Sequence, residues 1–247
     1  MKKFLFTLFS GLFIFASSYS QAHEITLLAE KFKTPVSVGY CLRYLPSAIK
    51  INELLKANSI GTIYNCNIDI GQYLPDWRPG KNHLDSVSAS KALGGGVLLE
   101  LSHELDYASW LLGPLHVESS ILRTSSELNL DVEEIADLVL STDKGTICNI
   151  HLDFLQKKPN RYCTFIGSEG RLDWDLIQNS ILYSTKNQTK LIFSELNWDR
   201  NQMYLDMILD FMKLIKLGFS DSVDVKHAEY IVKLIDTIKS KSKWRQV

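Results

Sequence analysis

The residues that could do chemistry are densest between positions 93 and 113, in the run LGGGVLLELSHELDYASWLLG. Glu100, His103 and Asp106 follow one another at intervals of three, so a helix places them on one face. A histidine near a helix start feels the positive end of the helix dipole, which favours the neutral ring that accepts a proton. A neighbouring carboxylate fixes the tautomer of such a ring or tunes its basicity. The spacing predicts acid–base chemistry at His103 and Glu100, with Asp106 as a contact to the substrate.

Three consecutive glycines, residues 94–96, come before this row. They permit unusual backbone angles and let a ligand approach the main chain, so Gly95 and Gly96 are further predicted substrate contacts. Contiguous glycines are not a dinucleotide-binding fingerprint, which needs spaced glycines after a strand and an acidic residue about 20 positions later. The plainer alternative is a row of surface polar residues on an ordinary amphipathic helix, with glycines that only form the turn.

Aromatic and basic residues in the irregular stretch 71–96 form a second group. The segment QYLPDWRP contains Tyr73, Trp77 and Arg78. Aromatic rings stack on sugars or bases, and a guanidinium binds a carboxylate or phosphate through two hydrogen bonds. Arg43, in GYCLRY, is a similar candidate. A loop this long in a compact domain is usually functional, so we predict that these four side chains contact the substrate. A packing loop and a plain ion pair are the alternatives.

The elements that must position these residues follow from hydrophobic periodicity. Helices are predicted at 23–33, 46–56 and 100–112, followed by two amphipathic helices near the C-terminal end and a solvated basic tail, KSKSKWR. Strands are predicted at 36–42, 63–70, 117–125, 134–142, 145–154, 161–166, 170–175 and 180–185. Strands joined by tight turns pair antiparallel, and helices before and after such a run cover one face. We predict an α+β fold with a largely antiparallel open sheet and helices packed on one face.

Composition excludes several classes of protein. The 247 residues are 45% hydrophobic and 22% charged, with a formal net charge of -1, which argues against a nucleic-acid partner. No internal apolar run reaches the roughly 18 residues of a membrane-spanning helix. No metal-ligand spacing occurs, so we expect no metal site. Cys41, Cys66, Cys148 and Cys163 fit either buried free thiols or two disulfides in any of three pairings.

Four motifs together resemble the Gfo/Idh/MocA oxidoreductases: GYCLRY, GQYLPDWRP, GGGVLLELSHELDYASWLLG and HLDFLQKKPNRYCTFIGSEGRLDWD. The similarity is closest to members that act on sugars or nucleotide-sugars. It implies that residues 23–247 correspond to the family's C-terminal α+β domain, which holds the substrate and forms a homo-oligomer through the outer face of its sheet. The family's N-terminal Rossmann domain, which binds NAD(P), and its Glu-Lys-Pro motif have no counterpart in this sequence.

The resemblance also implies roles for the first group of residues. The family's histidine donates or accepts the proton during hydride transfer, and it corresponds to His103, with Glu100 as the acidic residue before it. We therefore expect the substrate-binding half of an NAD(P)-dependent oxidoreductase, a truncated member that cannot transfer hydride alone. An exported, non-catalytic carbohydrate-binding or oligomerisation module is the alternative.

The N-terminal residues 1–22 bear on the choice between these two alternatives. Lys2 and Lys3, an apolar run at 4–16, and small residues at Ser20 and Ala22 form the three-part pattern of a secretory signal peptide. A working signal implies export with no membrane span in the mature chain, whereas the family resemblance implies a cytoplasmic protein. An apolar element at the edge of the core, or an accidental reading frame, also fits the pattern.

Overall fold

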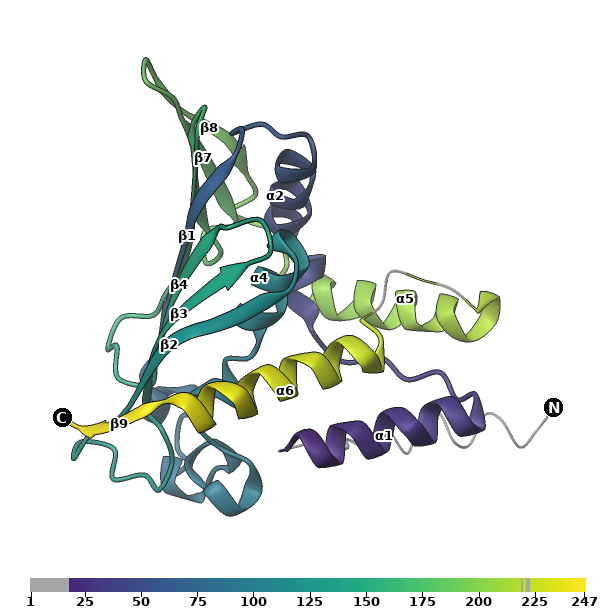
Figure 1. Cartoon of the computed structure of the whole chain (residues 1–247), viewed down its shortest axis with the longest axis vertical. Helices are drawn as coiled ribbons and strands as arrows, with labels where there is room; N and C mark the ends of the chain where they lie inside the picture. Colours follow the sequence, from purple (N-terminus) through teal and green to yellow (C-terminus); the bar gives the residue numbers. More distant parts are fainter. Residues whose placement is uncertain (1–17, 219, 221–222) are drawn as a thin grey trace.

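The computed structural model describes residues 18–218, 220 and 223–247, so the apolar run at 4–16 lies outside it. In the described residues, one sheet forms one layer and the helices form the other, all on the same side of the sheet (Figure 1). The strand order is β8-β7-β6-β5-β1-β4-β3-β2-β9, without closure into a barrel. The strands are β1 (Ile63–Gly71), β2 (Leu115–Thr124), β3 (Ile135–Thr142), β4 (Ile147–Asp153), β5 (Asn160–Gly167), β6 (Arg171–Asp175), β7 (Ser180–Ser184), β8 (Thr189–Ser194) and β9 (Lys243–Gln246).

The sheet is mixed, so the predicted largely antiparallel arrangement is only partly right. The consecutive hairpin strands do pair antiparallel, but β1 pairs in parallel with β4 and β2 in parallel with β9. Both parallel pairs join strands that are far apart in sequence, where turn signals carry no information about direction. The basic end is not a solvated tail, because residues 243–246 extend the sheet along β2. The edge strand β8 was not predicted either.

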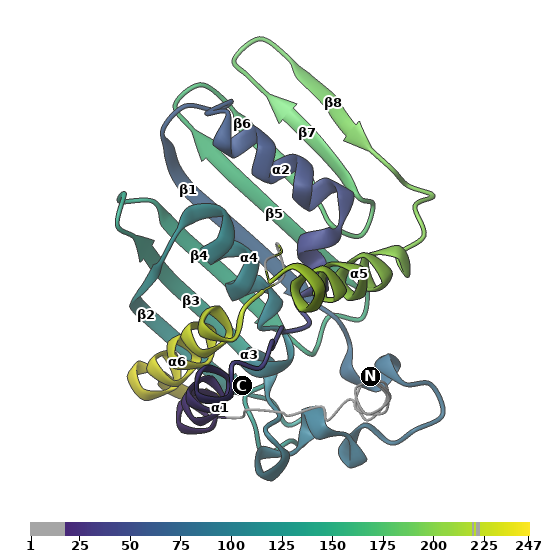
Figure 2. The same cartoon turned by 90° about the vertical axis from the view of Figure 1, so that its right-hand side faces the viewer.

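The helices are α1 (Tyr19–Phe32), α2 (Pro46–Lys56), α3 (Val97–Glu100), α4 (His103–Leu112), α5 (Gln202–Leu217) and α6 (Val225–Lys241). The helix predicted at 46–56 is confirmed, and α1 begins four residues earlier than the predicted 23–33 because the Ser18 hydroxyl caps it. Figure 2 shows α4 over the middle of the sheet and α1 beside α6, and α2 packs on the half of the sheet that ends in β7 and β8. No helix within the described ranges is long and apolar enough to span a membrane.

The predicted strand at 36–42 is wrong. Ser37 forms a single bridge with Asp224, and residues 41–44 form a 3₁₀ turn. Apolar alternation alone does not make a strand, because a strand also needs a neighbour to accept its backbone hydrogen bonds. The stretch 71–96 is irregular as predicted, with several short 3₁₀ turns.

The core lies between the sheet and the helices. Alternation along β1 directs Cys66 toward the helices and Asn67 to the outer face. Trp174 is fully buried, donates to the Ser47 hydroxyl (2.8 Å) and packs edge-to-face on Tyr107. All four cysteines are free and buried, and three of them lie on the adjacent strands β4, β1 and β5.

Candidate functional site

A cavity of about 670 Å³ lies where α1, α5 and α6 meet the start of α4. Its walls are mostly apolar, from residues such as Ile25, Val38 and Phe211. The polar part of the wall includes Glu100, Ser102 and His103. Ligand sites are typically apolar cavities of this size with a few convergent polar groups. The two residues predicted to do acid–base chemistry therefore face one common space.

His103 is the first residue of α4, and its ring lies edge-on to Tyr40 with 5.4 Å between the centroids. The Nδ1 atom is buried and has no hydrogen-bond partner within the described residues. Burial, followed by the positive charge of Arg161, lowers the pKa of His103. The imidazole is therefore neutral at pH 7 and able to accept a proton.

Glu100 ends α3, and the chain turns through Leu101 and Ser102 before α4 begins. The expected single helix is thus two helices, yet Glu100 and His103 still line the same cavity. Burial raises the pKa of Glu100, against the hydrogen bond from Ser88 and the charge of Arg78. A carboxyl group with a raised pKa holds and releases a proton closer to neutrality.

The glycines are explained by packing. Gly94, with φ of +81°, lines the cavity, whereas Gly95 and Gly96 are buried beside it. A Cβ on Gly95 would lie 2.4 Å from the Val87 carbonyl oxygen, and one on Gly96, which has φ of +108°, would lie 2.5 Å from Glu133. Only glycine fits here. That Gly95 and Gly96 contact a substrate stays a prediction.

Arg43 and Asp106 do not line this cavity. They form a buried ion pair with hydrogen bonds of 2.6 and 3.0 Å, and the His227 ring lies 2.9 Å from the same carboxylate. The Arg43 guanidinium also lies over the Trp110 ring. The pair joins the 3₁₀ turn at Cys41–Tyr44 to α4 and α6. That Arg43 and Asp106 contact a substrate stays a prediction.

A second buried pair under the site was missed by sequence reasoning. Arg161 on β5 donates to both carboxylate oxygens of Glu104 on α4, at 2.7 and 3.1 Å. The sequence did contain a sign of this pair. Arg161 lies two and four residues before Cys163 and Phe165, so on a strand its side chain points to the same face as theirs, toward the helices. An arginine at an inward position needs a buried partner.

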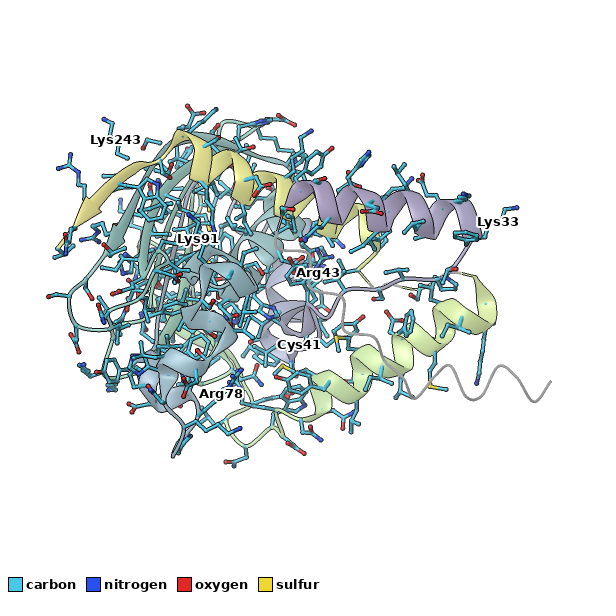
Figure 3. All side chains as sticks on the ribbon, turned by 90° about the horizontal axis from the view of Figure 1, so that it is seen from below. Lys33, Cys41, Arg43, Arg78, Lys91 and Lys243 are labelled. Carbon is cyan, nitrogen blue, oxygen red and sulfur yellow. The ribbon has the colours of Figure 1, made fainter. Side chains whose placement is uncertain are left out.

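The loop residues fall in two places. Trp77 and Arg78 line a second cavity of about 330 Å³ formed by the loop 74–88, whereas Tyr73 packs under the Lys157 ammonium group. Figure 3 shows Arg78 at the edge of the molecule and Arg43 deep among the helices. Ser88 lines the loop cavity and bonds Glu100, so the two cavities share a wall.

Comparison with known proteins agrees with this architecture. The family described as the GFO/IDH/MocA C-terminal domain matches residues 48–173, about half of the chain and all of the glycine–Glu100–His103 region. The chain belongs to the GFO/IDH/MocA family. No curated protein matches it in sequence.

Solved structures share the fold of this GFO/IDH/MocA chain at low identity. KijD10, a 3-ketoreductase from Actinomadura kijaniata in complex with NADP and TDP-benzene, is 14% identical with a TM-score of 0.77, over 94% of this chain and 70% of that one. An NAD binding oxidoreductase from Klebsiella pneumoniae is 16% identical with a TM-score of 0.79, over 92% and 69%. UDP-N-acetylglucosamine 3-dehydrogenase GnnA from Acidithiobacillus ferrooxidans is 13% identical with a TM-score of 0.71, over 92% and 68%.

The described residues of this GFO/IDH/MocA chain do not fit a complete dinucleotide site. Such a site needs a strand that leads through a spaced glycine loop into a helix, whose N–H groups hold the pyrophosphate. The contiguous glycines 94–96 follow a 3₁₀ turn. Val87 and Glu133 occupy the space beside Gly95 and Gly96. The described part of the chain thus has an apolar cavity lined by Glu100 and His103, and no arrangement of residues that would hold a whole dinucleotide.

Proposed function

We propose that this chain is the substrate-binding part of an NAD(P)-dependent oxidoreductase that acts on a sugar or nucleotide-sugar. The observation that carries the proposal is the neutral His103, with an unpartnered Nδ1, beside Glu100 in the wall of one apolar cavity. In the direction of oxidation, His103 accepts the proton of the substrate hydroxyl. In the direction of reduction, it returns a proton to the carbonyl oxygen. The neighbours whose names include a ketoreductase and a nucleotide-sugar dehydrogenase support this class of substrate.

The exposed apolar surface of α1 and α5 supports a separate dinucleotide-binding domain that packs there. The helices leave large apolar side chains in solvent, namely Leu27, Leu28, Phe32, Leu205, Ile208, Leu209 and Leu217. Apolar surface of this extent marks an interaction site. The segment 34–40 beside it belongs to no helix or strand and forms one bridge, from Ser37 to Asp224. A domain packed on this side would hold the cofactor against the cavity of His103, and the chain alone would be inactive.

The outer face of the sheet is proposed to join copies of the chain. It carries no helix within the described residues, and it is polar, with Asn149 bonded to Asn65 and Asn67 across β4 and β1. An interface here would be rich in hydrogen bonds rather than apolar. Sedimentation analysis tests the point, and a strictly monomeric chain at high concentration contradicts it.

Binding measurements test the main proposal. Fluorescence quenching should show no NADH binding to the isolated chain, whereas calorimetry with a panel of UDP- and TDP-sugars should show binding. His103→Asn should abolish turnover once the cofactor domain is supplied, and His116→Asn, on the exposed part of β2, should leave it unchanged.

The contradicting outcomes are specific. Micromolar NADH binding by the chain alone would refute the separate cofactor domain, and full turnover by His103→Asn would make this histidine structural. A chain that is found cleaved after Ala22 and binds a free sugar without NADH would instead favour the exported carbohydrate-binding module.

A further inference from the structure

The candidate base His103 lacks the usual device that orients a catalytic histidine. A hydrogen bond from one ring nitrogen to a carboxylate or a backbone carbonyl commonly fixes the tautomer and the ring. The Nδ1 atom of His103 is buried, yet it has no such partner within the described residues. The torsion that turns an imidazole ring has only a broad preference of its own. The orientation of this ring therefore depends on the side chains packed against it.

Tyr40 packs directly on the His103 ring. The ring centroids are 5.4 Å apart and the planes cross at 83°, which is the edge-to-face geometry that aromatic pairs prefer. Tyr40 is 6% exposed and lines the same cavity as His103. Its hydroxyl is hydrogen-bonded to Ser102, the residue just before His103. Tyr40 thus contacts both the imidazole and the turn that leads into it.

The Arg43–Asp106 ion pair holds the two rings in register. Arg43 lies three residues after Tyr40, and Asp106 lies three residues after His103. The two hydrogen bonds of the pair, at 2.6 and 3.0 Å, therefore tie together the segments that carry the rings. The Tyr40 carbonyl also accepts a hydrogen bond from the Arg43 backbone N–H (3.3 Å). An ion pair with two parallel hydrogen bonds fixes geometry as well as supplying energy.

We propose that Tyr40 is the positioning residue of the candidate base, which holds the His103 imidazole in the orientation from which it meets the substrate. The inference rests on the proposed function, since it gives Tyr40 a role in the reaction of His103. Tyr40 does not accept the proton itself, because burial raises the pKa of its phenol and keeps the hydroxyl protonated. Its ring supplies the packing surface, and its hydroxyl holds the turn at Ser102.

NMR of the His103 ring in the chain alone tests the contact without any turnover. In Tyr40→Met the signals of the imidazole should move, because the neighbouring aromatic ring is gone. The pKa of His103 should rise, because burial is the main cause of its lowered value. The charges that act on the ring, from Arg161, Glu104 and Asp106, are the same in this variant. Tyr40→Phe keeps the aromatic ring, so it should change His103 much less.

Tyr44→Met is the matched control. Tyr44 lies in the same 3₁₀ turn and is half-buried, but it is outside the cavity lining, and its hydroxyl donates to Asp210 (2.9 Å). This variant should leave the His103 signals unchanged.

Kinetics with the cofactor domain supplied test the role in the reaction. Tyr40→Met should lower kcat about 10- to 100-fold and change KM less than about threefold, because a misplaced base slows proton transfer rather than binding. Tyr40→Phe should restore most of kcat, and Tyr44→Met should match wild type.

The results that overturn the inference differ from those that overturn the proposed function. Unchanged His103 signals in Tyr40→Met, an equal change in Tyr44→Met, or a raised KM with unchanged kcat refutes the positioning role. If turnover then still depends on His103, the proposed function stands without it. A changed His103 ring in Tyr40→Met, together with full turnover by His103→Asn, supports the contact and rejects the reaction.

A second pair of variants tests the hydroxyl contact if circular dichroism shows that Tyr40→Met does not fold. Ser102→Ala and Tyr40→Phe each remove one side of the same hydrogen bond. Their effects on the His103 signals should be alike, and the double variant should show no further change. Additive effects, or no effect of either variant, would refute the inference.

Discussion

Replacing Arg161 with methionine should strongly destabilise the protein. The Glu104 carboxylate has no exposed surface, and Arg161 supplies two hydrogen bonds to it. Methionine fills a similar volume but leaves the buried negative charge without a partner. Breaking a buried ion pair in this way costs about 3–5 kcal/mol. In a domain of this size each kcal/mol lowers the melting temperature by roughly 2–4 °C, so we expect a loss of about 6–20 °C.

The matched control is Arg171→Met on the neighbouring strand β6. Arg171 also binds a carboxylate, that of Asp173, but its side chain is 53% exposed, against 18% for Arg161. The Asp173 carboxylate is itself buried, but it keeps a hydrogen bond from Thr164 (3.1 Å), and water can replace the half-exposed guanidinium. This variant should therefore lose less stability than Arg161→Met. The double variant Glu104→Gln/Arg161→Met should be more stable than Arg161→Met alone, because the unpaired charge has gone.

Urea unfolding and thermal melts measure these differences. The same variant affects the candidate base, because the charge of Arg161 contributes to the lowered pKa of His103. Removing that charge should raise the pKa of His103 in an NMR titration. Melting of Arg161→Met within 2 °C of wild type, or an equal loss in Arg171→Met, would refute the argument from burial.

Two further predictions concern stability. Hydrogen bonds to carboxylates, chiefly Asp153, raise the pKa of His151 from 6.5 to about 9. The protonated ring therefore stabilises the fold fully below pH 6.5, and this contribution is lost as the pH rises through 9. Because the ring is one-third exposed, we expect about 1–2 kcal/mol, and urea unfolding of His151→Gln should lack this pH dependence. Gly96→Ala should cost about 2 kcal/mol or more, through its positive φ and the contact with Glu133. Gly80→Ala, with φ of +79° against +108° for Gly96 and with open space around it, should cost less, and equal losses would contradict the steric explanation.

Local sequence patterns determined much of this protein. Helix 46–56, the hairpin strands and the irregular stretch 71–96 all follow from periodicity, turn residues and glycine content, which act between residues close in the chain. The spacing of Glu100 and His103 also indicated a shared site, and both line the same cavity even though a turn separates their helices.

Contacts between distant segments decided the rest. The parallel pairing of β1 with β4, the addition of residues 243–246 to the sheet, and the failure of 36–42 to form a strand all depend on neighbours far away in sequence. Which charged side chains form ion pairs also depends on the tertiary structure. In the folded chain Arg43 pairs with Asp106, whereas Arg78 forms no ion pair within the described residues and its charge acts on Glu100. A sequence shows which side chains are charged, but only the folded chain shows which charges are neutralised, because ion pairs form between residues that the fold brings together.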